Sequence, residues 1–305
     1  MSGAAPSRRA ENAAHTEEAE GELVKRVKGK TVKLEGFNNL TKSLSFNIYD
    51  ICYARSRESQ IEYLEYVDEE YNSSRLEVIT EEVTRIINAR LVHVSTQDYE
   101  PRGASLVALL NEDHGPLSTP TGTILSNGQA ASDGDPPHAG AGVVGHLDKS
   151  HIAIHTYPEY DNGTGLATFR VDIDISTCGM ISPLSALQYL LESFESEVVI
   201  IDYRVRGFTR DRRGRKLFID HDISSIQNYI SDDFLDAYSA YDVNIVSDNN
   251  FHTKMRKKKL VLKNYLFGSE VSGFAAKEKK RIKKALENEI QELFECKNLS
   301  GRGRS

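Results

Sequence analysis

Apolar and polar residues alternate along six stretches of this chain. The stretches are 44–53, 91–96, 104–110, 150–157, 167–177 and 198–208. In the fifth, Phe169, Val171 and Ile173 fall on one side, whereas Arg170 and Asp172 fall on the other. A period of two is typical of a strand with one buried face. The sequence therefore predicts at least six strands, and the Gly-bearing linker 161–165 predicts that 150–157 and 167–177 form a hairpin.

Apolar residues recur every three to four positions in the segments between these strands, which predicts helices. Two helical segments lie between 54 and 90, and Ser74 and Glu77 predict a capping box at the start of the second. Ser182 followed by Pro183 predicts another helix start. The last helix is predicted over 276–294, with Ile282, Leu286, Ile290 and Leu293 facing inward.

The order of these elements favours an α+β fold. Two strands, a helix and a further strand follow one another from residue 150, without the regular strand–helix alternation of a parallel sheet. That order predicts an αβ sandwich in which helices cover one face of a mainly antiparallel sheet.

Three segments lack any periodic pattern. We expect 1–28 to be a disordered N-terminal tail, 111–145 to be a flexible Gly- and Pro-rich loop, and 298–305 to be a basic tail. One folded domain is then predicted over 29–297.

Composition narrows the class of protein. The chain has 305 residues and a net charge of −7, which argues against a nucleic-acid-binding protein. No stretch is apolar enough for a membrane helix, and the N-terminus lacks the apolar core of a secretory signal. Cys52, Cys178 and Cys296 are widely spaced and odd in number. We therefore expect a cytoplasmic protein without disulfides or a four-cysteine zinc site.

Histidine, serine and cysteine mark a candidate reactive region. Five of the nine histidines lie between 114 and 155. His151 and His155 would be about 13 Å apart on a strand, which is too far to share one metal ion. Cys178 ends the predicted hairpin just before a helix start, where the dipole favours a thiolate. The hairpin predicts that Ser150, His155 and Cys178 meet at one end of the sheet, but the spacing alone identifies no reaction.

Two motifs stand out around the predicted hairpin: HLDKSHIAIHTYPE at 146–159 and STCG at 176–179. They resemble the prokaryotic pyruvoyl-dependent S-adenosylmethionine decarboxylases, most closely the longer form of enteric bacteria. The resemblance extends over about 30–295 and departs at the acidic tail, at the long loop and at the basic end. The other matching segments are 36–54, 97–105, 202–211, 218–233 and 251–255.

The resemblance implies an inactive precursor that cuts itself between Lys149 and Ser150. The products would be a β chain, 1–149, and an α chain, 150–305, whose first residue becomes a pyruvoyl group. By family position His155 is the proton acceptor in this processing, and Ser105 resembles a second serine used in it. Self-association of the two chains into a homo-oligomer with stacked sheets is also implied.

The same resemblance implies the reaction. The pyruvoyl group would form a Schiff base with S-adenosylmethionine and release CO₂, giving the aminopropyl donor for spermidine synthesis. Cys178 occupies the proton-donor position. Tyr99, Tyr157 and Glu159 match substrate-binding positions, since aromatic rings and a carboxylate suit a sulfonium cation. No acidic cluster identifies a metal site, and the Mg²⁺ requirement of enteric relatives is left open.

Three alternatives remain. The first is a pyruvoyl decarboxylase of arginine or ornithine, the second is an unprocessed regulatory homologue, and the third is a Cys–His or Ser–His hydrolase. Two basic runs, 202–216 and 254–263, are interpreted as solvated surface, although the first would also suit an anion or a dimer contact.

Overall fold

The computed structural model describes residues 40–100, 102–111, 150–211, 213–243, 247–268 and 271–299. The predicted tail 1–28, nearly all of the predicted loop 111–145, Lys149 and most of the predicted basic tail lie outside these residues.

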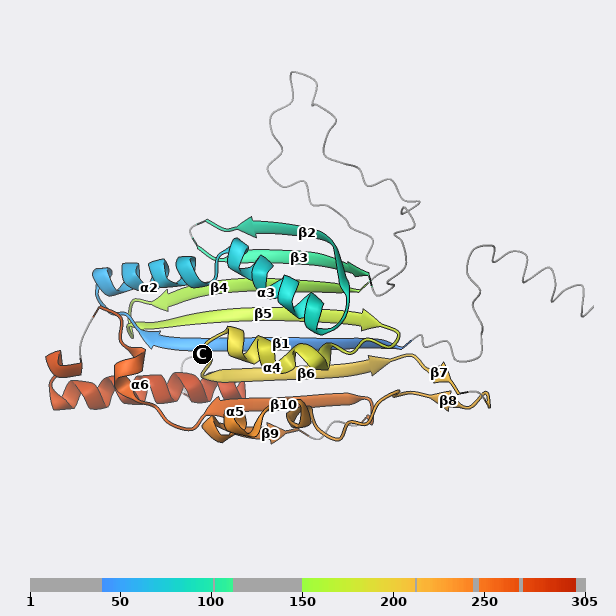
Figure 1. Cartoon of the computed structure of the whole chain (residues 1–305). Helices are drawn as coiled ribbons and strands as arrows, with labels where there is room; N and C mark the ends of the chain where they lie inside the picture. Colours follow the sequence, from blue (N-terminus) through green and yellow to red (C-terminus); the bar gives the residue numbers. More distant parts are fainter. Residues whose placement is uncertain are drawn as a thin grey trace, which may run out of the picture.

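Eight strands form a single sheet in the order β2-β3-β4-β5-β1-β6-β10-β9, and every neighbouring pair is antiparallel (Figure 1). The strands are β1 (Thr41–Tyr53), β2 (Arg90–Asp98), β3 (Ala104–Asn111), β4 (His151–Asp161), β5 (Leu166–Cys178), β6 (Val198–Arg206), β9 (Tyr238–Asp242) and β10 (Asn250–Lys257). A two-stranded ribbon, β7 (Thr209–Arg210) and β8 (Lys216–Leu217), extends beyond one end of the sheet. The predicted strands and hairpin are confirmed.

One face of the sheet is apolar and lies under helices. Leu44, Phe46 and Ile48 alternate with Ser45 and Asn47 along β1, and the apolar set is almost fully buried. Three helices cover this face (Figure 1). They are α2 (Arg57–Glu70), α3 (Ser73–Ile86) and α4 (Leu187–Ser193). Burial of one face of each element therefore produces the core that the alternation predicts.

The last helix, α6 (Ala276–Glu295), lies on the opposite face. Its buried residues Ile282, Leu286 and Ile290 pack against Ile51 and Val198, which belong to the other side of β1 and β6. The prediction of helices on one face thus holds for α2, α3 and α4, whereas α6 covers one end of the second face. The rest of that face, near the start of β1, is polar.

Two predicted helix starts differ from the structure. The N-cap of α3 is Asn72, whose side chain accepts the Arg75 N–H at 2.9 Å, so the capping box predicted at Ser74 is wrong. Ser182 makes no side-chain cap bond, and a short 3-10 helix, η1 (Pro183–Ala186), precedes α4. The remaining elements are α5 (Asp232–Ala237), η2 (Ile226–Tyr229), η3 (Leu262–Tyr265) and η4 (Val271–Gly273). No described helix has both the length and the apolar character needed to cross a membrane.

Candidate active site

The first group of predicted site residues lies where β4 begins and β5 ends. Ser150 directly precedes β4 and is only 4% exposed, and its carbonyl accepts the Leu110 N–H at 2.7 Å. His151 pairs with Ser176, so Ser150 lies opposite Thr177, and Cys178 is the next residue of β5, with its side chain on the other face of the sheet. Cys178 is exposed. We call Ser150, Thr177 and Cys178 the strand-start cluster.

A second group lies farther along β4, on the face that α2, α3 and α4 do not cover. Ser105 of β3 is directly opposite His155. The Tyr99 hydroxyl is 3.4 Å from His155 Nδ1, and the Tyr157 ring lies 6.2 Å from the imidazole and nearly parallel to it. We call Ser105, His155, Tyr99 and Tyr157 the histidine cluster. Glu159 follows two residues later on the same face and is exposed.

A tight turn between β2 and β3 places Tyr99 in this cluster. The Tyr99 N–H donates to the Gly103 carbonyl at 2.7 Å, and the Ala104 N–H donates to Thr156 Oγ1 at 2.7 Å. Gly103 has φ +110°, and a Cβ there would come within 2.7 Å of the Thr156 carbonyl oxygen. Only glycine fits this position, which fixes the approach of the turn to β4.

Polar side chains of the neighbouring strands surround the histidine cluster. Asp172 of β5 is directly opposite His155 and accepts a 2.6 Å hydrogen bond from Asn47 Nδ2. Arg170 forms an ion pair with Asp172 at 3.2 Å, and its guanidinium lies 4.4 Å from the centre of the Tyr157 ring. The predicted substrate-binding aromatics therefore share a charged, hydrogen-bonded surface with His155.

The two clusters are separate within one chain. Ser150 and His155 are five residues apart on one strand, which corresponds to about 16 Å, and an odd separation places their side chains on opposite faces. The predicted meeting of Ser150, His155 and Cys178 at one sheet end is therefore wrong for a single chain. Ser150 and Cys178 lie at the same end of the sheet but, by the same alternation, on opposite faces, whereas His155 lies with Ser105.

Similar proteins identify the family. A family described as S-adenosylmethionine decarboxylase matches residues 128–207. An S-adenosylmethionine decarboxylase proenzyme of Alkalilimnicola ehrlichii is 52% identical over 272 residues, which are 89% of this chain and 97% of the relative. The proenzyme of Hahella chejuensis is 53% identical over 268 residues, covering 88% and 98%. The chain belongs to the S-adenosylmethionine decarboxylase family.

Membership of the S-adenosylmethionine decarboxylase family makes the chain an enzyme.

The crystal structure of the adenosylmethionine decarboxylase from Aquifex aeolicus is 16% identical, with a TM-score of 0.29 over 61% of this chain and 99% of that one. A similarity this low supports no comparison of the two folds.

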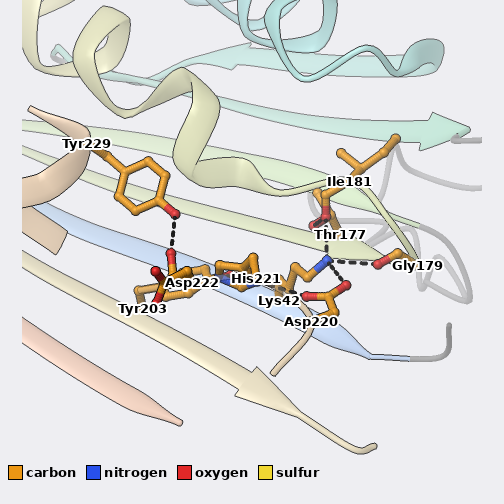
Figure 2. Close-up of polar contacts among 9 residues, drawn as sticks. All are labelled: Lys42, Thr177, Gly179, Ile181, Tyr203, Asp220, His221, Asp222 and Tyr229. Carbon is orange, nitrogen blue, oxygen red and sulfur yellow. Dashed lines mark hydrogen bonds and ion pairs between the residues drawn. The ribbon is translucent and has the colours of Figure 1, made fainter. Parts of the chain in front are cut away.

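One buried group beside the strand-start cluster escaped the sequence analysis of this decarboxylase-family chain. Lys42 is 1% exposed, and its ammonium contacts the Gly179 carbonyl oxygen and Asp220 Oδ2, each at 2.8 Å (Figure 2). The sequence does contain a sign of this buried lysine. Lys42 is two residues before Leu44 and four before Phe46, so its side chain falls on the apolar, buried side of β1. Asp220, far away in sequence, gave no such signal.

A second buried charge cluster lies at the opposite end of β1. Glu197 accepts the Ile51 N–H at 3.0 Å and forms an ion pair with Lys257 at 3.2 Å. Burial, together with the nearby Glu197 carboxylate, raises the pKa of Asp50 well above its ordinary range. These groups line a cavity of about 410 Å³ that contains none of the predicted site residues. Across the residues that the structure describes, no three His, Cys, Asp or Glu side chains are grouped to hold a metal ion.

Proposed function

We propose that this chain cuts itself between Lys149 and Ser150 and decarboxylates S-adenosylmethionine to S-adenosylmethioninamine and CO₂. The product is the aminopropyl donor for spermidine synthesis, and the reaction takes place in the cytoplasm. Two relatives that are more than half identical to the chain are named proenzymes of this decarboxylase. The observation that carries the proposal is the position of Ser150, which follows Lys149 in the sequence, lies nearly buried directly before β4, and is at the same end of the sheet as Cys178.

The cut needs only groups of the chain itself. The Ser150 hydroxyl attacks the Lys149 carbonyl and converts the amide into an ester. A base then removes the Cα proton of residue 150, and β-elimination releases 1–149 with a C-terminal carboxylate. The dehydroalanine left on 150–305 hydrolyses to a pyruvoyl group and ammonia. The Leu110–Ser150 hydrogen bond supports this step, because it anchors the new chain start to β3.

Residues of both clusters suit the subsequent reaction. A pyruvoyl carbonyl supplies the electron sink that loss of CO₂ from an amino acid requires. Cys178 is one register position from residue 150 at the same end of the sheet, and we assign to it the delivery of a proton to the substrate Cα. Tyr99 and Tyr157 offer aromatic faces to the sulfonium cation, and Glu159 offers a carboxylate to the ribose hydroxyls. A Mg²⁺ requirement, which the sequence leaves open, is not part of this proposal.

The separation of the clusters extends the proposal to two chains. His155 is the proton acceptor for processing, and Ser105 assists it, yet neither reaches Ser150 of the same chain. We infer that His155 and Ser105 of one copy act on Ser150 of a second copy in a homo-oligomer. The uncovered, polar sheet face carries the histidine cluster, so it is the surface through which one copy would present His155 to the β4 end of another.

Wild-type chain and the Ser150→Ala variant provide the test. Denaturing gels and release of labelled CO₂ from carboxyl-labelled S-adenosylmethionine, arginine and ornithine should be measured together. We expect two fragments and release from S-adenosylmethionine for the wild type, and an intact, inactive chain for the variant. CO₂ release from arginine or ornithine would identify one of these amino acids as the substrate instead. An intact wild type that decarboxylates nothing would favour a regulatory homologue. An intact wild type that hydrolyses ester substrates would favour a Cys–His or Ser–His hydrolase. Cleavage of the variant would contradict the proposed nucleophile.

A further inference from the structure

We propose that the buried Lys42–Asp220 ion pair positions the turn after Cys178, so that the thiol is held where it serves the reaction at residue 150. The proposal rests on the function assigned above to Ser150 and Cys178. Lys42 acts on these residues through the backbone carbonyls of Gly179 and Ile181, and Asp220 acts through Lys42, so both are positioning residues rather than catalytic ones.

Burial of the Lys42 ammonium costs free energy of desolvation. Moving an ammonium out of water costs several kcal/mol unless its hydrogen bonds are replaced. Here its three N–H groups meet three acceptors: the Gly179 carbonyl at 2.8 Å, the Ile181 carbonyl at 3.3 Å and Asp220 Oδ2 at 2.8 Å (Figure 2). Two of the three acceptors are backbone oxygens of the turn that follows Cys178.

Further hydrogen bonds hold the turn after Cys178 in place. Gly179 has φ +67°, a conformation that glycine adopts readily, and its N–H donates to the Leu40 carbonyl at 3.1 Å. Thr177 Oγ1 donates to the Ile181 carbonyl at 3.0 Å. Lys42 is the in-register neighbour of Thr177 on β1, and Thr177 lies opposite Ser150. The ammonium therefore sits one strand away from the strand-start cluster and holds the backbone on the far side of Cys178.

The acidic partner extends this support to another segment. Asp220 Oδ1 is 2.8 Å from His221 Nδ1, and His221 Nε2 is 3.1 Å from the hydroxyl of Tyr203 on β6. Figure 2 shows Lys42, Asp220, His221 and Tyr203 as a continuous series of contacts from the turn to β6. A buried ion pair is weak evidence for stability, because apolar replacements of both partners are often neutral. What this pair supplies is a defined position for two carbonyl groups.

That distinction makes the proposal testable. Lys42→Met leaves the Asp220 carboxylate buried without its cation, so the single variant should lose stability. The double variant Lys42→Met/Asp220→Asn removes the charge as well and should recover much of the melting temperature. It does not restore the bonds to Gly179 and Ile181. Lys257→Met, which breaks the half-buried Lys257–Glu197 pair at the opposite end of β1, is the matched control.

Two measurements follow, on the full chain and well below every melting temperature. Amide hydrogen exchange of the peptide spanning 177–182 should be about threefold or more faster in the double variant and unchanged in Lys257→Met. In the cleaved fraction, kcat for CO₂ release should fall about tenfold to hundredfold with KM within about twofold, because a displaced proton donor slows chemistry more than binding.

The outcomes separate this inference from the proposed function. The positioning role is overturned if the wild type is cleaved and active while the double variant exchanges its 177–182 amides at the wild-type rate or has the wild-type kcat. A wild type that is neither cleaved nor active overturns the proposed function, and the inference falls with it. If the double variant does not fold, Asp220→Asn decides: it should show the same changes in smaller degree, and wild-type exchange and kcat would overturn the inference.

Discussion

The strand-start cluster and the histidine cluster use the same strand in different ways. Ser150 lies just before the start of β4, nearly buried, with its carbonyl bound to β3 and Cys178 one register position away on β5. His155 lies on the uncovered face, between Ser105 and Asp172 and within reach of the Tyr99 hydroxyl. One cluster holds the bond to be cut and a thiol, and the other holds a base and aromatic rings. Because a strand is rigid, about 16 Å of β4 keeps them apart unless a second chain brings them together.

Removing the base should produce the largest effect. We expect His155→Ala to slow cleavage by about hundredfold or more and to stall the chain at the Lys149–Ser150 ester, because no group removes the Cα proton. Hydroxylamine should then split the accumulated chain. The control is His93→Ala on β2, an exposed histidine outside both clusters, which should be cut like the wild type. Normal cleavage of His155→Ala would remove the histidine cluster from processing.

Mixing two defective chains sharpens the comparison. Ser150→Ala keeps an intact histidine cluster, and His155→Ala keeps an intact strand-start cluster. Co-expressed with distinguishable tags, the His155→Ala chain should be cut and the Ser150→Ala chain should not. The readout is the mass of each tagged chain. If neither chain is cut in a mixed oligomer, the base acts within its own chain and the division of the site between two copies is refuted.

Loss of the thiol should affect turnover more than processing. Cys178→Ala should still be cut, while kcat falls about tenfold to hundredfold and activity is lost faster during turnover, since the substrate Cα no longer receives its proton from the thiol. Cys296→Ala, an exposed cysteine at the end of α6, is the control. Steady-state rates and progress curves give both quantities, and wild-type turnover by Cys178→Ala would separate the thiol from the reaction.

The far end of β1 should show the smallest effect, and only on stability. The folded-state pKa of Asp50 is raised by burial and by Glu197, so folding favours its protonated form and wild-type stability falls as pH rises above the unfolded value. Asp50→Asn does not titrate. It should be more stable than the wild type by about 1–2 kcal/mol above the folded-state pKa, with the difference shrinking towards pH 4. Denaturant unfolding across pH would show it, and a difference that does not vary with pH would contradict the raised pKa.

The sequence predicts elements with one buried face better than it predicts contacts across the sheet. Phe169, Val171 and Ile173 gave β5 directly, because alternation and burial have the same cause. The sequence did not predict which face of the sheet α6 covers, because Ile51 and Val198, on which it packs, are apolar residues on a face that is otherwise polar. The α3 start was missed because Asn72 and Ser74 are both good caps, and local sequence does not decide between them.

The candidate site shows the same limit. A hairpin register suffices to bring Ser150 and Cys178 to the same end of the sheet, but the alternation along β5 puts the thiol on the other face. The prediction that His155 lies beside Ser150 was wrong for two reasons. Five strand residues span about 16 Å, and an odd separation puts the two side chains on opposite faces of the sheet. The Lys42–Asp220 pair joins β1 to a segment 178 residues later, and such long-range pairing is specified only by the folded chain.

Mass spectrometry of the purified wild type under denaturing conditions tests the central claim most directly. Two species should appear, 1–149 and 150–305, with the second lighter by one ammonia than the same residues beginning with serine. An active preparation that contains only the intact 34.1 kDa chain contradicts the claim.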